Sequence, residues 1–176
     1  MAPTSPLRTT TRPRFPSVCP YRCRQGAPLE LHANIVGVHL VFERAGRVLL
    51  GLRSPDSAYA PATWHLPAGH LERESATACA VREAGEELGV TIHEQDLRLV
   101  HIVHHRDGGD GRARMQLLFH VLAYAGTPAI REPDRCTALE WWPYAALPSP
   151  LVDYTAVALT GIAAGRTYTE MGWAAA

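Results

Sequence analysis

The sequence predicts an α/β domain in which a mixed β-sheet lies between helices. Two observations support this class: several strand-like runs follow one another as hairpins, and two segments repeat their apolar residues at helical spacing. The chain of 176 residues suits one domain with a sizeable hydrophobic core. We expect this domain to span residues 29–165, between a disordered basic arm at 1–28 and a C-terminal tail at 166–176.

The first predicted element is a hairpin. Residues 34–42, NIVGVHLVF, form an almost continuous apolar run that is typical of a buried strand. Arg44, Ala45 and Gly46 predict a turn, after which residues 47–53 predict the return strand. Arg53, at the end of that strand, is either a phosphate contact or an ordinary surface residue. A polar loop with two prolines then leads to residue 64.

The most informative stretch covers residues 64–90, WHLPAGHLERESATACAVREAGEELGV, and ends in a helix pattern. Ser75 or Thr77 can cap the start of this helix, and Gly89 is placed to end it in a left-handed turn. One side of the helix is mostly apolar and should pack on the core; it carries Thr77, Ala80, Val81, Ala84 and Leu88.

The other side of the same helix carries three carboxylates, Glu83, Glu86 and Glu87. Residues three and four apart are neighbours on a helix, so like charges at this spacing repel by roughly 0.2–0.5 kcal/mol per pair. A bound cation would neutralise that repulsion, and oxygen-only ligands favour Mg²⁺ or Mn²⁺ over zinc. The alternative is an ordinary amphipathic helix with a solvated acidic face.

The later part of the chain predicts further strands and a second helix. The strands are expected at residues 97–106, 115–124 and 139–142, and the helix at 151–164. Residues 107–111, DGGDG, predict a flexible turn that could act as a lid.

The residues around the acidic helix decide between the two interpretations. Apart from one missing residue before the first glutamate, they match the pattern G-x5-E-x7-R-E-U-x-E-E-x-G-U, in which U is aliphatic, with Gly69 and Glu74 as the first glycine and glutamate. The remaining positions are filled by Arg82, Glu83, Ala84, Glu86, Glu87, Gly89 and Val90. The stretch therefore resembles the Nudix box, the signature of the Nudix hydrolases, and the preceding W-x-L-P-x-G is also typical of that family.

The sequence departs from the family pattern at one place. Four residues, 70–73, separate Gly69 from Glu74, where the family has five. The spacing is intact from Glu74 onward, so the ligands on the helix should be unaffected. The departure concerns the geometry of the loop and the reach of Glu74 towards Arg82.

The resemblance implies a Nudix-type α/β/α sandwich and an enzyme that uses Mg²⁺, with Mn²⁺ as an alternative. The implied metal ligands are Glu83, Glu86, Glu87 and the main-chain carbonyl of Ala68. Arg82 is implied to pair with Glu74 and to fix the carboxylate cluster, since a guanidinium fork can hold a carboxylate bidentately. Four residues therefore form the implied catalytic group: Glu74, Arg82, Glu83 and Glu86.

The general base varies within the family and is left open here. Glu83 or Glu86 could serve through a metal-bound water. The acids to consider outside the box are Asp107, Asp110, Glu132 and Glu140, and for each of them the sequence favours a plain surface charge.

Residues outside the box must bind the rest of the substrate. Arg53 and His70 are candidate phosphate contacts, while Trp64 and Trp141 are candidate stacking surfaces for a base. Trp141 and Trp142 are adjacent on a predicted strand, so they should point to opposite faces and at least one should pack in the core.

The resemblance implies hydrolysis of a diphosphate linkage in a nucleoside diphosphate derivative, and analogy favours a nucleoside triphosphate. One alternative is a Nudix-derived ligand-binding or regulatory module without turnover, which the shortened loop favours and the complete set of carboxylates opposes. A second alternative is a non-hydrolytic isomerase of prenyl diphosphates, which only the fold shared within the family supports.

Composition narrows the expected partners. The 17 basic and 17 acidic residues balance, so the overall charge makes no case for nucleic acid or a membrane surface as a partner. With no apolar span and no leader pattern, we expect a cytoplasmic protein that binds a small nucleotide-like substrate, with a homodimer left open. Cys19 and Cys23 lack a second pair of zinc ligands and are expected to be reduced thiols.

Overall fold

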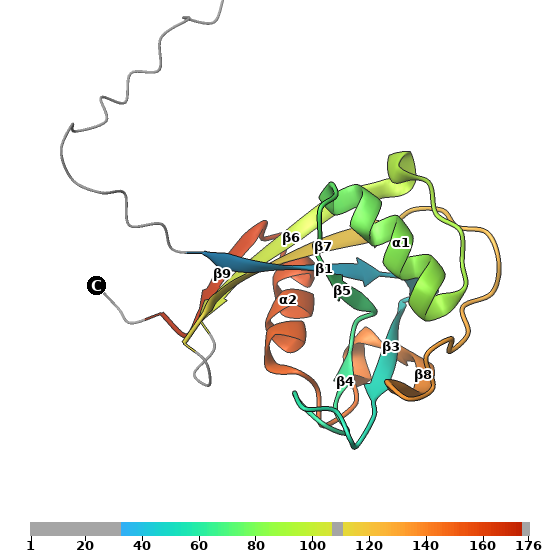
Figure 1. The fold of residues 1–176 in the computed structure, drawn as a ribbon. Helices are drawn as coiled ribbons and strands as arrows, with labels where there is room; N and C mark the ends of the chain where they lie inside the picture. Colours follow the sequence, from blue (N-terminus) through green and yellow to red (C-terminus); the bar gives the residue numbers. More distant parts are fainter. Residues whose placement is uncertain (1–32, 107–110, 174–176) are drawn as a thin grey trace, which may run out of the picture. The chain divides into compact units, whose positions relative to one another are not determined.

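The computed structural model describes residues 33–106 and 111–173, which form two β-sheets and two α-helices (Figure 1). The arm expected at 1–28 and the tip of the predicted lid at 107–110 lie outside these residues. None of the helices in the described part of the chain is long and apolar enough to cross a bilayer.

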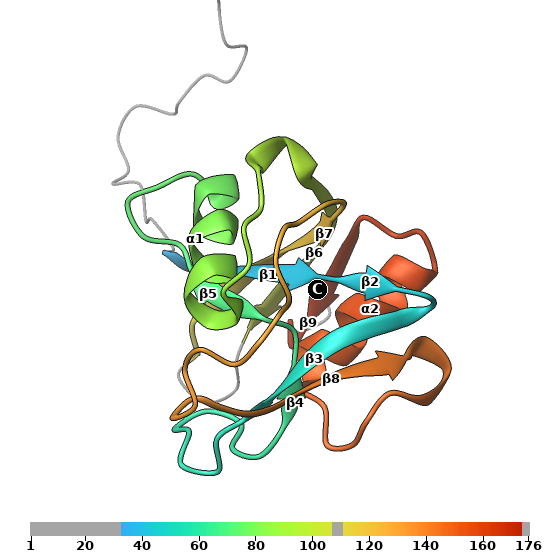
Figure 2. The same cartoon turned by 90° about the vertical axis from the view of Figure 1, so that its right-hand side faces the viewer.

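The larger sheet has five strands of mixed direction and confirms the predicted fold class. Its spatial order is β5 (Ala68–His70), β1 (Asn34–Val41), β7 (Ala113–Val121), β6 (Leu97–Arg106) and β9 (Tyr168–Met171). β1 runs parallel to β7, and β9 runs parallel to β6, whereas the other two pairs are antiparallel. The two views of the ribbon show α1 (Ala76–Leu88) and α2 (Asp153–Ala163) on opposite sides of this sheet (Figures 1 and 2).

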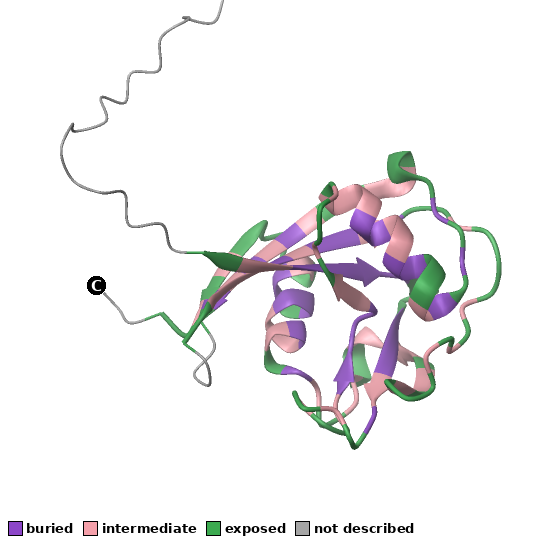
Figure 3. Ribbon diagram, in the orientation of Figure 1, coloured by how far each residue is buried: buried purple, intermediate pink, exposed green. Residues whose placement is uncertain are grey.

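Two hydrophobic clusters explain why the sheet lies between the helices. Adjacent residues of one strand point to opposite faces, so Leu40 and Phe119 pack under α1 while Val41 and Leu118 pack towards α2. The helices contribute small and aliphatic side chains to these clusters: Cys79, Ala80, Ala84 and Leu88 from α1, and Ala158 and Leu159 from α2. The buried segments of Figure 3 therefore follow the central strands and the inward faces of both helices.

The second sheet is antiparallel and was not part of the prediction. It contains β2 (Glu43–Arg44), β3 (Arg47–Arg53), β4 (Trp64–His65) and β8 (Cys136–Pro143). The predicted turn exists between β2 and β3, and Ala45 and Gly46 have φ values of 50° and 72°, as a two-residue hairpin turn requires. The return strand pairs with β4 and β8, because both edges of β1 are already occupied by β5 and β7.

The ends of α1 follow the sequence signals closely. Ser75, not Thr77, is the N-cap, and its Oγ accepts a hydrogen bond from the main-chain N–H of Ala78 at 3.1 Å. Gly89 ends the helix with φ of 67°, and its N–H donates to the carbonyl of Gly85 at 3.1 Å. This helix holds five residues of the Nudix-like motif on two successive turns: Arg82, Glu83, Ala84, Glu86 and Glu87.

The segment expected to be a C-terminal tail contains a short strand, β9 (Tyr168–Met171). β9 adds to the edge of the larger sheet beside β6, and the indole N–H of Trp173 donates to the carbonyl of His104 at 3.0 Å. The periodicity argument missed β9 because four alternating residues, YTEM, carry little apolar signal. The predicted strands at 115–124 and 139–142 are observed at 113–121 and 136–143.

Candidate active site

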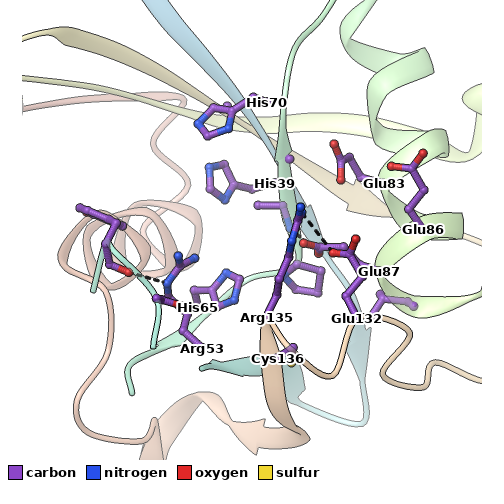
Figure 4. Close-up of a pocket in the computed structure, with 18 of the residues that line it drawn as sticks. His39, Arg53, His65, His70, Glu83, Glu86, Glu87, Glu132, Arg135 and Cys136 are labelled. Carbon is purple, nitrogen blue, oxygen red and sulfur yellow. Dashed lines mark hydrogen bonds and ion pairs between the residues drawn. The ribbon is translucent and has the colours of Figure 1, made fainter. Parts of the chain in front are cut away.

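Side chains from α1 and from both sheets line a pocket of about 920 Å³ (Figure 4). One side, which we call the helix wall, consists of Arg82, Glu83, Glu86 and Glu87 on α1. The loop wall consists of Arg53 and residues 57–59, which follow β3. Arg53 lies across the pocket from the three glutamates (Figure 4). Between the walls lies a floor that includes His39, His65, Gln116 and Tyr154.

Gly69 allows Glu83 to lie directly against the main chain of β5. A Cβ atom at Gly69 would stand 1.7 Å from the carboxyl carbon of Glu83. This distance is too short for any side chain, so no residue larger than glycine fits here without moving Glu83. Glu83 is buried, and this burial raises the pKa of its carboxyl although hydrogen bonding to Arg82 acts in the opposite direction. The first glycine of the motif is therefore required by the packing of an acidic side chain.

Arg82 holds three carboxylates at once. Its Nη2 and Nε lie 2.7 and 3.1 Å from Oε1 of Glu74, and its Nη1 lies 2.6 Å from Glu83 and 2.9 Å from Glu86. Hydrogen bonding to Arg82 lowers the pKa of Glu74. Glu74 thus reaches Arg82 across the shortened loop, and the pairing expected from the sequence is present.

Glu87 is held differently from the other two glutamates. Its Oε2 accepts a hydrogen bond from the main-chain N–H of Ala68 at 3.0 Å, which brings two of the predicted metal ligands together. Burial raises the pKa of Glu87 to about 8, and the hydrogen bond from Ala68 offsets this only in part. A cation in contact with this carboxylate would favour its ionised form.

The carboxylates are not gathered into a ready-made metal site. Within residues 33–106 and 111–173, no three His, Cys, Asp or Glu side chains converge in a metal-binding arrangement. Glu83 and Glu86 instead contact Arg82, and Glu87 contacts Ala68. The oxygen donors themselves are of the kind that a hard divalent cation requires.

The floor of the pocket contains neutral imidazoles. Nε2 of His39 lies 2.8 Å from Oε1 of Gln116, whose amide nitrogen lies 2.9 Å from His105. Burial lowers the pKa of His39 to about 4 and that of His65 to about 3, so both rings are uncharged at neutral pH. The sequence reasoning missed these residues; the available signal was a single histidine within the apolar run of β1.

Two of the four predicted substrate contacts lie in the pocket and two do not. Arg53 and His70 line it, whereas Trp64 and Trp141 do not. Trp64 is only 8 % exposed and packs edge-on against Trp142, with ring centroids 5.4 Å apart. Trp141 packs against the cluster under α1, and Trp142 against the other cluster, as strand alternation predicts. The structure therefore corrects the stacking role expected for Trp64 and Trp141.

Of the candidate general bases outside the motif, one lies in the pocket and another does not. Glu132 lines the pocket and forms an ion pair with Arg135 at 3.3 Å, whereas Glu140 does not line it. Asp107 and Asp110 lie outside the described residues. Glu132 is brought there by the segment after β7, whose Arg131 N–H donates to the carbonyl of Glu87 at 3.1 Å.

Comparison with known proteins identifies the protein family of the chain that forms this pocket. A profile of the NUDIX domain matches residues 31–159, which include every residue of the helix wall and of the loop wall. The chain belongs to the NUDIX domain family. It is a Nudix hydrolase, a member of a family that hydrolyses nucleoside diphosphate derivatives.

Solved structures agree with this Nudix assignment. A MutT NUDIX hydrolase from Burkholderia pseudomallei is 32 % identical, with 73 % of this chain and 98 % of that one covered and a TM-score of 0.67. The ORF135 protein of E. coli is 26 % identical, with 80 % and 98 % covered and a TM-score of 0.60. The NUDIX domain of Shewanella oneidensis NrtR, solved with ADP ribose, is 19 % identical, with 80 % and 92 % covered and a TM-score of 0.59, and shows the shared fold alone.

Proposed function

We propose that this Nudix hydrolase is a Mg²⁺-dependent pyrophosphohydrolase that acts on a nucleoside triphosphate. The observation that carries the proposal is the helix wall, which places three carboxylates in one pocket with several arginines. Carboxylates can bind the metal that such a reaction needs, and the guanidinium groups of Arg53, Arg114 and Arg135 can bind phosphate oxygens.

The metal would be held by Glu83, Glu86 and Glu87 together with the main-chain carbonyl of Ala68. When bound, a divalent ion neutralises charge on the phosphate oxygens and makes a bound water more acidic. Mg²⁺ and Mn²⁺ both suit these oxygen ligands. The donor chemistry fits this role. Burial raises the pKa values of Glu83 and Glu87, and a cation beside these carboxylates would favour their ionised forms.

The other residues of the helix wall position these ligands. Arg82 is anchored through its Nε and Nη2 to Glu74, so the guanidinium keeps its place when Glu83 and Glu86 change partner. Gly69 lets the carboxylate of Glu83 approach the main chain. The proton of the attacking water would pass to Glu83, Glu86 or Glu132, the three candidate bases that line the pocket.

The rest of the pocket would bind the parts of the nucleotide that do not contact the metal, including a further phosphate. Arg53 and His70 are the proposed phosphate contacts among the residues predicted from the sequence, and both line the pocket. The neutral floor, with His39 and His65, offers hydrogen-bonding groups whose charge does not change near neutral pH.

The decisive experiment measures phosphate and pyrophosphate release from a panel of substrates with and without Mg²⁺. The panel should include nucleoside triphosphates, a dinucleotide, a nucleotide sugar and a prenyl diphosphate. We expect metal-dependent turnover of a nucleoside triphosphate. A titration with Mn²⁺, followed by electron paramagnetic resonance, tests metal binding independently of turnover.

The same panel separates the proposal from its alternative. A ligand-binding or regulatory module without turnover would bind nucleotides in equilibrium measurements and release no product under any condition. Turnover of the prenyl diphosphate or of the nucleotide sugar alone would contradict the choice of a nucleoside triphosphate and leave the family assignment unchanged.

A further inference from the structure

Tyr59 is an exposed aromatic residue on the rim of the pocket. Five large hydrophobic side chains are exposed in the described part of the chain: Tyr59, Leu99, Leu122, Tyr168 and Trp173. Of these five, Tyr59 alone lines the pocket, and its side chain is 45 % exposed. Exposure of an aromatic side chain inside a binding pocket is a common feature of ligand contacts, because the ring offers a large apolar surface.

The other aromatic side chains near the pocket are already packed. Tyr154 also lines it, but its ring lies 5.2 Å from His39 in an edge contact and 5.2 Å from His105 in a stacked contact. Trp64 and Trp141 pack in the hydrophobic core. Tyr59 is therefore the aromatic residue of the loop wall that is placed to receive a flat ligand.

Arg53 holds Tyr59 in position. The Nε–H of Arg53 donates to the main-chain carbonyl of Tyr59 at 2.9 Å, and the guanidinium carbon lies 5.7 Å from the centre of the tyrosine ring. This separation is within the range of cation–π contacts. A single arginine thus fixes the main chain of Tyr59 and lies near its ring.

The loop that carries Tyr59 is held by further contacts. The N–H groups of Ser57 and Ala62 donate to the carbonyl of buried Ser54, and the hydroxyl of Thr63 donates to the carbonyl of Ala60. Ala60 and Ala62 have φ values of 45° and 52°, a conformation that non-glycine residues rarely adopt. A loop held in this way presents its aromatic side chain with little conformational entropy left to lose on binding.

The loop wall lies where the base of a bound nucleotide would be expected. Arg53 lies across the pocket from Glu83, Glu86 and Glu87 (Figure 4). Tyr59 lies on the same side as Arg53, which donates a hydrogen bond to its main-chain carbonyl. A nucleotide whose metal-binding phosphates lie at the helix wall, with a further phosphate at Arg53, would extend its base past Arg53 towards Tyr59. We propose that Tyr59, supported by Arg53, is the stacking surface for the base of the substrate, an inference that rests on the proposed function.

The test compares substitutions of Tyr59 on two substrates. One is the best nucleoside triphosphate of the panel, and the other is methyl triphosphate, which has the same phosphates and no base. For Tyr59→Ala we expect KM for the nucleotide to rise about ten-fold, a typical effect of losing one base–aromatic stack, with kcat within about two-fold. Methyl triphosphate should be hydrolysed with unchanged kcat/KM.

Three further variants make the result specific. Tyr59→Phe and Tyr59→Trp should restore the KM of the wild type, because each keeps an aromatic ring. Tyr168→Ala is the matched control, since Tyr168 is 43 % exposed on β9 and does not line the pocket. Its kinetics should equal those of the wild type. Circular dichroism and Tm should show that all variants are folded.

The possible failures can be told apart. An unchanged KM in Tyr59→Ala, an equal loss on both substrates, or a Phe variant as weak as the Ala variant would overturn the stacking role. Absence of nucleotide turnover in the wild type would instead overturn the proposed function. In that case, calorimetric titration of wild type and Tyr59→Ala with a nucleoside monophosphate still decides the inference: ten-fold weaker binding to the variant supports it, and equal binding overturns it.

Discussion

The helix wall of the pocket comes from residues 82–87 of one helix, whereas the loop wall and the floor are assembled from β1, β3, β4, β7, α2 and the loop after β3. The helix wall is a local structure, so the spacing of its acids in the sequence already determines how they face one another. The other surfaces form only when strands that are distant in sequence pair. A motif search can therefore find one side of such a pocket and overlook the other.

The two regions also differ in charge. The helix wall holds three carboxylates, of which Glu83 and Glu86 contact Arg82, and the pKa values of Glu83 and Glu87 are raised by burial. The floor holds His39 and His65, whose imidazoles are uncharged at neutral pH for the same physical reason. This difference suits a substrate with a charged diphosphate at one end and an uncharged nucleoside at the other.

The largest expected effect comes from the helix wall. Glu86→Gln or Glu87→Gln should lower kcat by about 10²–10³-fold or more, because each removes a charged group from the proposed metal site. The fold should be intact by circular dichroism. Glu140→Gln, on β8 and outside the pocket, is the control and should keep the activity of the wild type. An unchanged kcat in both helix-wall variants would remove the metal-site assignment.

A smaller effect is expected from the contact between β5 and the helix wall. Gly69→Ala would place a Cβ atom against the carboxyl group of Glu83 and displace it, so kcat/KM should fall by roughly 10–100-fold. Gly85→Ala is the matched control on α1, since nothing lies within 4 Å of its Cβ position. It should raise the free energy of unfolding by about 0.5–1 kcal/mol. Equal activity of the two variants would argue against the tight packing of Glu83.

The buried carboxyl of Glu87 predicts a pH effect on stability in metal-free protein. Its pKa is raised from 4.5 to about 8, so between these values the folded state retains a proton that the unfolded state has lost. Stability should therefore fall as the pH rises through this range. Glu87→Gln lacks this titration, so with a chelator present its Tm should exceed that of the wild type by a few degrees at pH 8.

At pH 4.5 the two Tm values should be nearly equal, because Glu87 is then largely protonated in the folded state. A Tm difference of the same size at both pH values would show that the burial of an ionised carboxylate is not its cause.

The smallest effect is expected for the loop before α1. Insertion of a glycine between Arg73 and Glu74 restores the usual family spacing, and Glu74 already lies 2.7 Å from Arg82 without it. Activity should stay within about two-fold of the wild type or rise, because a longer loop allows the same ion pair. A large loss in kcat/KM would mean that the short loop is adapted to a particular substrate.

These comparisons show which parts of the protein can be predicted from its sequence. The bounds of α1 and the strand at 97–106 followed from local signals: a capping serine, a terminal glycine and a run of strand-forming residues. The pairing of Arg82 with Glu74 followed from the family motif. Each of these features depends on residues close together in the chain or on a pattern already known.

The remaining features depend on tertiary pairing. Residues 47–53 look like the partner of β1, yet pair elsewhere because the edges of β1 are taken by β5 and β7. Alternation predicted that Trp141 and Trp142 face opposite ways, but it could not show that both faces pack in the core. Tyr59 lies in a polar loop without periodicity, and only the structure places it at the pocket.

The central claim is that Glu83, Glu86 and Glu87 bind one or more divalent ions. The most direct measurement is anomalous diffraction from a crystal soaked in Mn²⁺. We expect a strong anomalous peak beside these carboxylates and the carbonyl of Ala68, with Arg82 still paired to Glu74. No peak at this position, with Arg82 still bonded to Glu83 and Glu86, would contradict the account.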